Sequence, residues 1–308
     1  MGAETPVQST LHAASGSGAE LIEQLGWALY AGAGLIFAAV FGLAIYAVFG
    51  RARAVNTKLW ILGAGVAFPV VTLAVLLVNA LAIGNALEHG AHGGSALRVH
   101  VVGKQWWWEV RYDSADTAIL ANEIHIPIGA EVELLLTTTD VIHSLWVPSL
   151  AGKVDMIPGR TNRLLIRSDT PGVFRGQCAE YCGGQHAWMA LHVVVEPQAQ
   201  FDAWLAQQAR PREAISRDSE GYRLFMRGEC ARCHTVRGTD ARGDQGPDLT
   251  HVGSRQALAA GTLRNHVGTM AGWIAASQDV KPGNAMPSSL EYTGRELRVL
   301  SQWLASLE

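Results

Sequence analysis

Apolar residues fall in three successive patterns along the 308-residue chain. The first pattern is a pair of long uncharged stretches at residues 27–50 and 59–83. At about 1.5 Å per helical residue, each stretch can cross a hydrocarbon core of about 30 Å. Buried helices of a soluble core rarely stay uncharged for this length, so the pattern predicts a two-helix transmembrane anchor.

The second pattern begins at residue 97, where short apolar runs are separated by Gly, Pro, Asp and Asn. Short strands at this spacing are typical of an all-β sandwich or barrel. We expect strands at residues 97–102, 106–112, 123–128, 131–136, 163–167 and 191–196. Pro197 ends the run.

The third pattern is a loop-rich tail with short helical stretches, expected at residues 201–208, 219–226 and 294–307. A charged joint at residues 210–213 marks a domain boundary, and a Gly/His-rich linker lies at residues 88–95. His89 and His92 of this linker are expected to be ordinary flexible-linker residues. The chain therefore divides into a leader (1–24), the anchor (25–86), a β domain (96–200) and a helical domain (212–308).

Charge adds an orientation to this picture. The net charge is −3 and no basic block stands out, which argues against nucleic-acid binding. The loop between the two stretches carries Arg51, Arg53 and Lys58 and no acidic residue. The positive-inside rule places this loop in the cytoplasm, so both termini and everything after residue 85 are expected on the extracytoplasmic side of the membrane.

Four cysteines form two tight pairs, and each pair has a histidine beside it. The first pair lies in a twelve-residue segment that also carries an imidazole and a thioether: Cys178, Cys182, His186 and Met189. Soft sulfur and imidazole ligands select copper, and two cysteines four residues apart can bridge a pair of copper ions. A pair of ions needs a second histidine, for which His143 is the candidate. A zinc site is one alternative, but it would not use the methionine as a ligand. A disulfide is another, but it would leave both histidines and the methionine without a role.

These segments resemble the CuA domain of cytochrome c oxidase subunit II over about residues 20–200. The matching motifs are C-x-E-x-C-x3-H-x2-M, the upstream H-S-L-W-V-P, the aromatic run at 106–108 and the segment 153–160. The resemblance implies a cupredoxin-like fold and a dinuclear copper centre. It implies bridging ligands Cys178 and Cys182, and terminal ligands His143, His186, Met189 and the backbone carbonyl of Glu180.

The same resemblance assigns two further roles and exposes one departure. The carboxylate of Glu180 would bind a magnesium ion at the interface with subunit I, and Trp106 would be the point where electrons enter. A packed aromatic strand is the alternative for the Trp run. Many members carry a glutamate near the start of the second membrane span, where this chain has Thr57, so proton uptake by that route is in question here.

The second cysteine pair lies in Cys230-Ala-Arg-Cys233-His234, the C-x-x-C-H pattern of covalent haem c attachment, with His234 as proximal iron ligand. A thioredoxin-like redox pair would need a βαβ context that the pattern lacks. The loop before Met286 resembles the methionine loop of class I cytochromes c and implies Met286 as distal ligand, with Met270 as the other candidate. His251 and His266 are expected at the surface or near the haem propionates.

Taken together, the chain resembles subunit II of a caa3-type haem–copper oxidase of a bacterial plasma membrane. Electrons would pass from haem c to CuA and on to haem a, haem a3 and CuB of subunit I, coupled to proton translocation. Subunit III, the lipid bilayer and a donor, either a cytochrome c or a quinol–cytochrome c complex, would be further partners. A nitric oxide reductase subunit is the alternative. A quinol oxidase subunit would lack the copper ligands, and a copper-delivery protein would not explain the haem motif.

Overall fold

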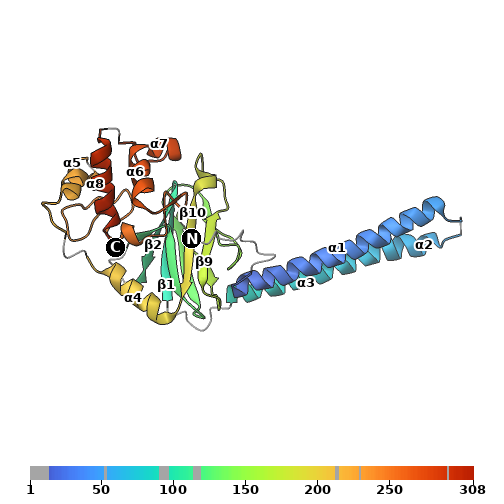
Figure 1. The fold of residues 1–308 in the computed structure, drawn as a ribbon. Helices are drawn as coiled ribbons and strands as arrows, with labels where there is room; N and C mark the ends of the chain where they lie inside the picture. Colours follow the sequence, from blue (N-terminus) through green and yellow to red (C-terminus); the bar gives the residue numbers. More distant parts are fainter. Residues whose placement is uncertain are drawn as a thin grey trace.

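A computed structural model describes residues 14–51, 54–89, 97–113, 119–211, 215–228, 230–289 and 291–308. It contains two long apolar helices, a β-sandwich and a helical domain, in the predicted order. The helical hairpin projects away from one side of the sandwich, and the helical domain packs on the other side (Figure 1). The predicted fold class is therefore confirmed.

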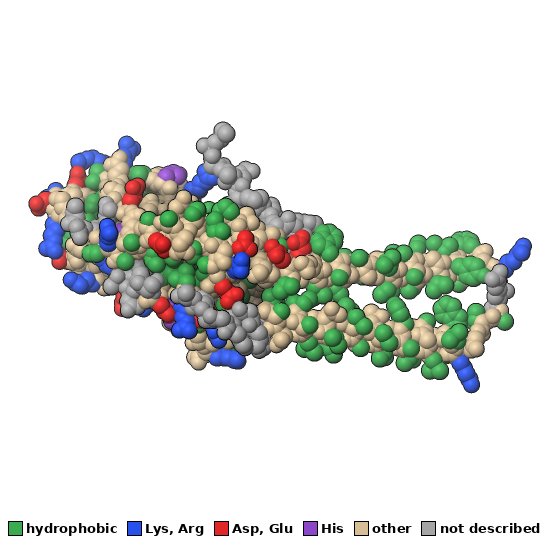
Figure 2. All heavy atoms as spheres, turned by 90° about the horizontal axis from the view of Figure 1, so that it is seen from below, with side chains coloured by type: hydrophobic (Ala, Val, Ile, Leu, Met, Phe, Trp, Pro, Cys, Tyr) green, Lys and Arg blue, Asp and Glu red, His purple; other side chains and the backbone are tan. Residues whose placement is uncertain are grey.

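The hairpin consists of α1 (Ser17–Phe49) and a second helix that runs without a break through α2 (Thr57–Leu59), the π-helical η1 (Trp60–Ala67) and α3 (Phe68–His89). The candidate membrane spans within them, Ser17–Phe49 and Thr57–Leu87, are 33 and 31 residues long, and none of the most apolar window of either span is buried. Apolar side chains cover the shaft, whereas Lys and Arg side chains gather at its tip (Figure 2). Both helices are thus long and apolar enough to cross a membrane.

The first helix begins inside the segment that the sequence predicted as a leader. Its start is tied to the β-sandwich, because the amides of Ser15 and Gly16 donate to the carbonyl of Ser149 at 2.7 and 3.0 Å. A Cβ on Gly16 would lie 2.3 Å from the carbonyl oxygen of Leu150, so only glycine permits this approach. Residues 1–13, Arg53 and most of the predicted linker, including His92, lie outside the described residues.

The sandwich consists of two five-stranded sheets. One has the order β3 (Ile119–Ala121), β2 (Trp107–Tyr112), β1 (Leu97–Lys104), β5 (Val132–Thr138) and β8 (Asn162–Ile166). The other has the order β4 (Glu123–Pro127), β10 (Ala190–Glu196), β9 (Gly172–Cys178), β6 (His143–Trp146) and β7 (Val154–Met156).

All six predicted strands are present. The six do not include β3 and β7, which have three residues each, β6, which has four, or β9, whose two glycines break the apolar run. Along the strands, residues that point into the sandwich alternate with residues that point outward. The inward-pointing residues of the two sheets form the core, and those that are fully buried include Val99, Val101, Ile124, Ile126, Leu134, Leu136 and Val193.

The helical domain follows α4 (Gln198–Ala209) and has its own core. It contains α5 (Glu220–Arg227), the 3-10 turns η4 (Cys230–Arg232) and η5 (Val252–Ser254), and the small hairpin β11 (Ala257–Leu258) and β12 (Leu263–Arg264). It ends with α6 (Val267–Ala275), α7 (Ser277–Val280) and α8 (Gly294–Ala305). Side-chain caps from Ser219 and Thr293 start α5 and α8. The two helices pack closely because Gly221 leaves room for Trp303.

A buried charged cluster joins the sandwich to both following segments. His125 on β4 lies between Glu123 and Glu196, with each ring nitrogen 2.8 Å from a carboxylate oxygen. Its ring stacks on Trp204 of α4 at 3.8 Å between centroids. The second oxygen of Glu123 accepts from the amide of Gln256 in the helical domain at 2.8 Å.

The stability of the protein is expected to depend on pH through His125. Burial alone would lower the pKa of this imidazole, but the two carboxylates outweigh burial and raise it. A raised pKa contributes stability that is complete below the ordinary histidine pKa of about 6.5 and is lost as the pH rises through the folded-state pKa. The contribution is about 1.4 kcal/mol for each unit of the increase.

Thermal unfolding against pH checks this expectation. His125→Gln is expected to lower the melting temperature below neutrality and to approach wild-type behaviour at alkaline pH. His100→Gln, which changes a half-exposed histidine outside this cluster, serves as the control. Parallel pH profiles for wild type and His125→Gln would contradict the assignment.

Candidate metal and haem sites

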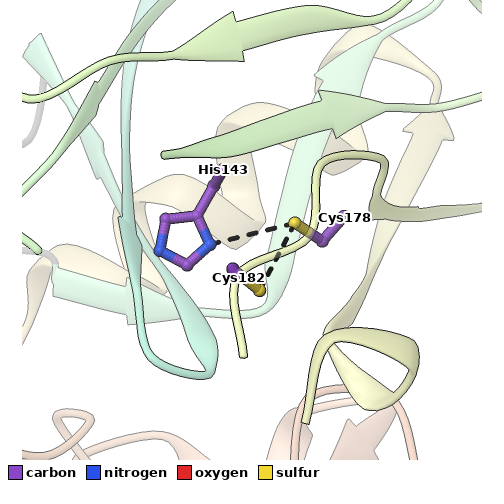
Figure 3. A group of neighbouring side chains, drawn as sticks. All are labelled: His143, Cys178 and Cys182. Carbon is purple, nitrogen blue, oxygen red and sulfur yellow. Dashed lines mark hydrogen bonds between the residues drawn. The ribbon is translucent and has the colours of Figure 1, made fainter. Parts of the chain in front are cut away.

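The first cluster of metal-ligating groups forms where β6 and β9 pair side by side. This register sets Leu145 opposite Cys178 and carries His143, two residues earlier, to the same end of the sheet. The Nδ1 atom of His143 lies 3.8 Å from Sγ of Cys178, which lies 3.8 Å from Sγ of Cys182 (Figure 3). The three side chains are buried, and their ligand atoms lie within 4.8 Å of one another.

The loop after β9 adds the remaining candidates. Sγ of Cys182 lies 3.7 Å from Nδ1 of His186 and 3.9 Å from Sδ of Met189, at the two ends of the turn that contains η3 (His186–Trp188). Sγ of Cys178 lies 3.2 Å from the carbonyl oxygen of Glu180. The structure therefore brings together all six residues that the resemblance implied. Two sulfurs flanked on each side by an imidazole nitrogen fit soft metal ions well.

The pKa values of the two thiols favour binding of a cation between them. Hydrogen bonding from the Cys182 thiol and from His143 lowers the pKa of Cys178, and the resulting thiolate raises the pKa of Cys182. Burial alone would lower the pKa of His143, but Cys178 and Asp140 raise it. One negative charge is thus held easily between the sulfurs, and a cation would allow the second thiol to ionise as well.

Sequence reasoning missed the group that orients His143. Oδ1 of Asp140 lies 2.8 Å from Nε2 of that ring, so Nδ1 is left facing the sulfurs. Asp140 is itself held by the amides of Gln105 and Val141, each at 2.6 Å. A carboxylate three residues before a ligand histidine was the available signal, because outer carboxylates commonly orient ligating imidazoles.

Asp140→Asn is expected to weaken copper binding by about 10–100-fold, the usual effect of losing such an outer partner. The amide can present the wrong atom to Nε2 and so disturb the imidazole tautomer. Competition with a copper chelator measures the change. The exposed carboxylate variant Asp169→Asn is the control, and equal affinities for the two variants would refute the role.

Trp106 and the carboxylate of Glu180 lie at the edge of this cluster. The indole of Trp106 is partly buried and donates to the carbonyl of Cys182 at 3.0 Å. The side chain of Gln105, which the sequence did not single out, donates to the same carbonyl at 2.7 Å. The Glu180 carboxylate is half exposed and lies 3.6 Å from Nζ of Lys153.

The second site is built around η4, which carries Cys230 and precedes Cys233 and His234. All four cysteines of the chain are free thiols. Nδ1 of His234 lies 2.7 Å from the carbonyl of Pro247, which leaves Nε2 as the metal-binding atom. Burial lowers the pKa of His234, so the ring is held in the neutral form that binds metals. A Cβ on Gly246 would lie 2.6 Å from Cε1 of the ring, so the imidazole packs directly against the glycine backbone and leaves no room for a side chain there.

The candidates for the distal position lie in the same core. Met270 on α6 is buried, and Met286 packs partly buried against the cluster. The Met286 loop is rigidly held, since the Met286 carbonyl accepts from Ser277 and Gln278, each at 2.7 Å. Two histidines have other roles: His266 caps α6, and His251 is buried and bonds to the carbonyl of Arg210 at 2.9 Å. The surface expectation is thus wrong for His251, whose ring fills the joint with α4.

The helical domain contacts the loop that carries Cys182, His186 and Met189. The side chain of Gln185 donates to the carbonyl of Pro282 at 2.8 Å, and the ammonium of Lys281 donates to the carbonyls of Trp106 and Trp188 at 3.1 and 3.0 Å. The sequence gave no signal for these contacts, because the partners lie 93 or more positions apart, in different domains. Fold and sites together define a redox protein with two long apolar helices, a soft-metal site and a C-x-x-C-H domain.

Comparison with known proteins gives this class a family. The family model described as cytochrome C oxidase subunit II, periplasmic domain, matches residues 114–197, and the cytochrome c model matches residues 219–308. Cytochrome c oxidase subunit 2 of Bacillus sp. (strain PS3) is 30% identical over 78% of this chain and 72% of its own length. The chain belongs to the cytochrome c oxidase subunit 2 family.

A second relative agrees with this assignment. Cytochrome c oxidase subunit 2 of Alkalihalophilus pseudofirmus is 34% identical over 70% of this chain, which spans 63% of that relative's length. The periplasmic domain of subunit II of cytochrome oxidase of Bradyrhizobium japonicum matches at a TM-score of 0.35 and 29% identity, covering 37% of this chain and 94% of that one. Copper and haem are the cofactors that the two family models imply. The nitric oxide reductase alternative is not favoured.

Proposed function

We propose that the chain is the subunit through which electrons enter a terminal cytochrome c oxidase. It would take electrons at a haem c in the helical domain and pass them to a copper centre in the sandwich. The observation that carries the proposal is the contact between the two sites. The loop before Met286 donates and accepts hydrogen bonds directly with the loop that holds Cys182 and His186.

The copper site is proposed to be dinuclear, with Cys178 and Cys182 as bridging ligands. His143, His186, Met189 and the carbonyl of Glu180 are proposed as terminal ligands. A bound copper pair would exchange one electron at a time while sharing its charge across two thiolates. The protein's part is to hold the ligands from paired strands and one short turn, so that little rearrangement accompanies each electron.

The haem is proposed to be joined through thioether bonds to Cys230 and Cys233, with His234 and Met286 as axial ligands. Pro247 and Gly246 fix the imidazole plane and its tautomer, as described above. Such a haem would supply one-electron transfer at a raised potential. Met270 is the other candidate, although its place inside α6 gives it less freedom than a loop residue.

The remaining assignments rest on family likeness and on geometry that is compatible with it. Trp106 is proposed as the group that electrons cross on the way to copper, since its indole is bonded to a ligand residue. The Glu180 carboxylate is proposed to bind magnesium at the interface with subunit I. The hairpin would span the bacterial plasma membrane twice, with both domains outside. Subunits I and III, lipid and a cytochrome c or quinol–cytochrome c donor would complete the caa3-type assembly.

Spectroscopy of the full chain tests the proposal. The chain is produced with haem maturation and copper and is purified in detergent. A low-spin c-type optical spectrum, together with the multi-line electron paramagnetic resonance signal of a mixed-valence copper pair, is the expected result. Haem with one copper ion, or with none, would overturn the dinuclear assignment and the oxidase role that depends on it.

A further inference from the structure

The interface between the two domains contains one buried lysine. Lys281 belongs to the helical domain, in the loop that leads to Met286, and its side chain enters the sandwich side of the interface. Only 2% of its surface is exposed. Its ammonium donates to the carbonyls of Trp106 and Trp188 in the sandwich and to that of Ala259 in its own domain, at 3.1, 3.0 and 3.4 Å.

These three acceptors satisfy all the hydrogen atoms of the ammonium. They come from three separate segments: the approach to β2, the turn before Met189 and the small hairpin of the helical domain. Burial lowers the pKa of Lys281 to about 8, which reflects the cost of moving the charge out of water. Charge-assisted bonds to three carbonyls offset that cost only while the two domains stay docked.

The rest of the interface surrounds this contact with further hydrogen bonds. The amide of Ala190 donates to the carbonyl of Ala260 at 3.0 Å, and the amide of Gln256 donates to Glu123 at 2.8 Å. The side chain of Gln185 donates to the carbonyl of Pro282, the residue after Lys281, at 2.8 Å. Lys281 is the only Lys or Arg among the buried polar residues of the described part of the chain.

We propose that Lys281 is a positioning residue that holds the Met286 loop of the helical domain against Trp106 and the loop that carries Cys182 and His186, and so keeps the two domains docked for internal electron transfer. The inference rests on the proposed function of the two sites. Its physical basis is that electron transfer between two tethered domains depends on how large a fraction of molecules is docked. Removing the ammonium leaves three carbonyls without their donor and lowers that fraction.

The test compares full chains in detergent. Lys281→Met keeps most of the length of the side chain but removes its charge and donors. Arg295→Met removes an exposed cation of the same domain, which pairs with Glu220 of α5, and is the matched control. Hydrogen exchange at the Ala190 and Gln256 amides reports docking, and it needs neither copper nor haem.

In Lys281→Met, exchange at these two amides is expected to rise about tenfold, the effect of losing one charge-assisted hydrogen-bond set. Amide hydrogen exchange in the core of the sandwich and in the core of the helical domain should be the same as in Arg295→Met. In loaded protein, transfer from reduced haem to copper should slow to a similar degree and become dependent on solvent viscosity. The optical and magnetic resonance signatures of both sites should be unchanged. A merely structural role would not produce a viscosity-dependent rate with intact sites.

The outcomes separate the two proposals. Lys281→Met that matches Arg295→Met in amide exchange and in rate would overturn the positioning role. Loaded wild-type protein that shows no transfer between its sites would overturn the proposed function, while amide exchange would still decide the role of Lys281. If Lys281→Met does not fold, Gln185→Met removes the neighbouring interdomain bond and is judged by the same two measurements.

Discussion

Replacing Cys182 with serine is expected to abolish the paired copper centre. Its sulfur is the hub of the cluster, with Cys178, His186 and Met189 each within 3.9 Å. A hydroxyl is a hard and weakly acidic ligand, so it cannot replace a thiolate between two soft ions. We expect the affinity for copper to fall by more than about 100-fold, beyond the range for losing an outer partner.

Copper content and magnetic resonance spectra check this result. The multi-line mixed-valence signal should disappear, and at most one copper ion should remain for each chain. Gly184→Ser is the matched control, because it introduces the same side chain into the same loop at a position where a Cβ meets nothing within 4 Å. A Cys182→Ser protein that keeps two copper ions and the signal would show that the ligand set is wrong.

Gly246→Ala is expected to disturb the haem site although it changes no ligand. The added methyl carbon would lie 2.6 Å from Cε1 and 2.8 Å from Nδ1 of His234, closer than carbon and nitrogen atoms can approach. The imidazole must then turn away from its bond to the Pro247 carbonyl. Overpacking of this kind destabilises a core by about 1–3 kcal/mol, and here it also tilts the proposed iron ligand.

The measurements are the haem absorption spectrum and the thermal unfolding of the full chain. We expect part of the haem to lose its low-spin spectrum and the helical domain to unfold at a lower temperature. Gly272→Ala on α6 is the control in the same domain, since a Cβ there meets no neighbour and alanine favours helix. If Gly246→Ala has the same haem spectrum and stability as Gly272→Ala, then close packing of Gly246 does not position His234.

The sequence by itself determined the kinds of chemistry and the order of the domains. Motifs that lie within one turn or loop, such as Cys178 to Met189 and Cys230 to His234, carry ligand type and spacing in a short segment. Long apolar stretches and period-two alternation are likewise local, which is why the anchor and six strands were predicted. Local patterns also set the limits: β9 was missed because Gly172 and Gly176 interrupt its apolar alternation.

The tertiary structure decided what lies beside what. Sheet register placed His143 next to Cys178, 35 residues away. Docking of the two domains buried Lys281 against the carbonyl of Trp106, 175 residues away. The start of α1 at Ser17 also depends on contacts with the sandwich. The physical reason is the same in each case: a short sequence window records its own turns and periodicity, whereas these contacts arise from the packing of segments that are distant in the chain.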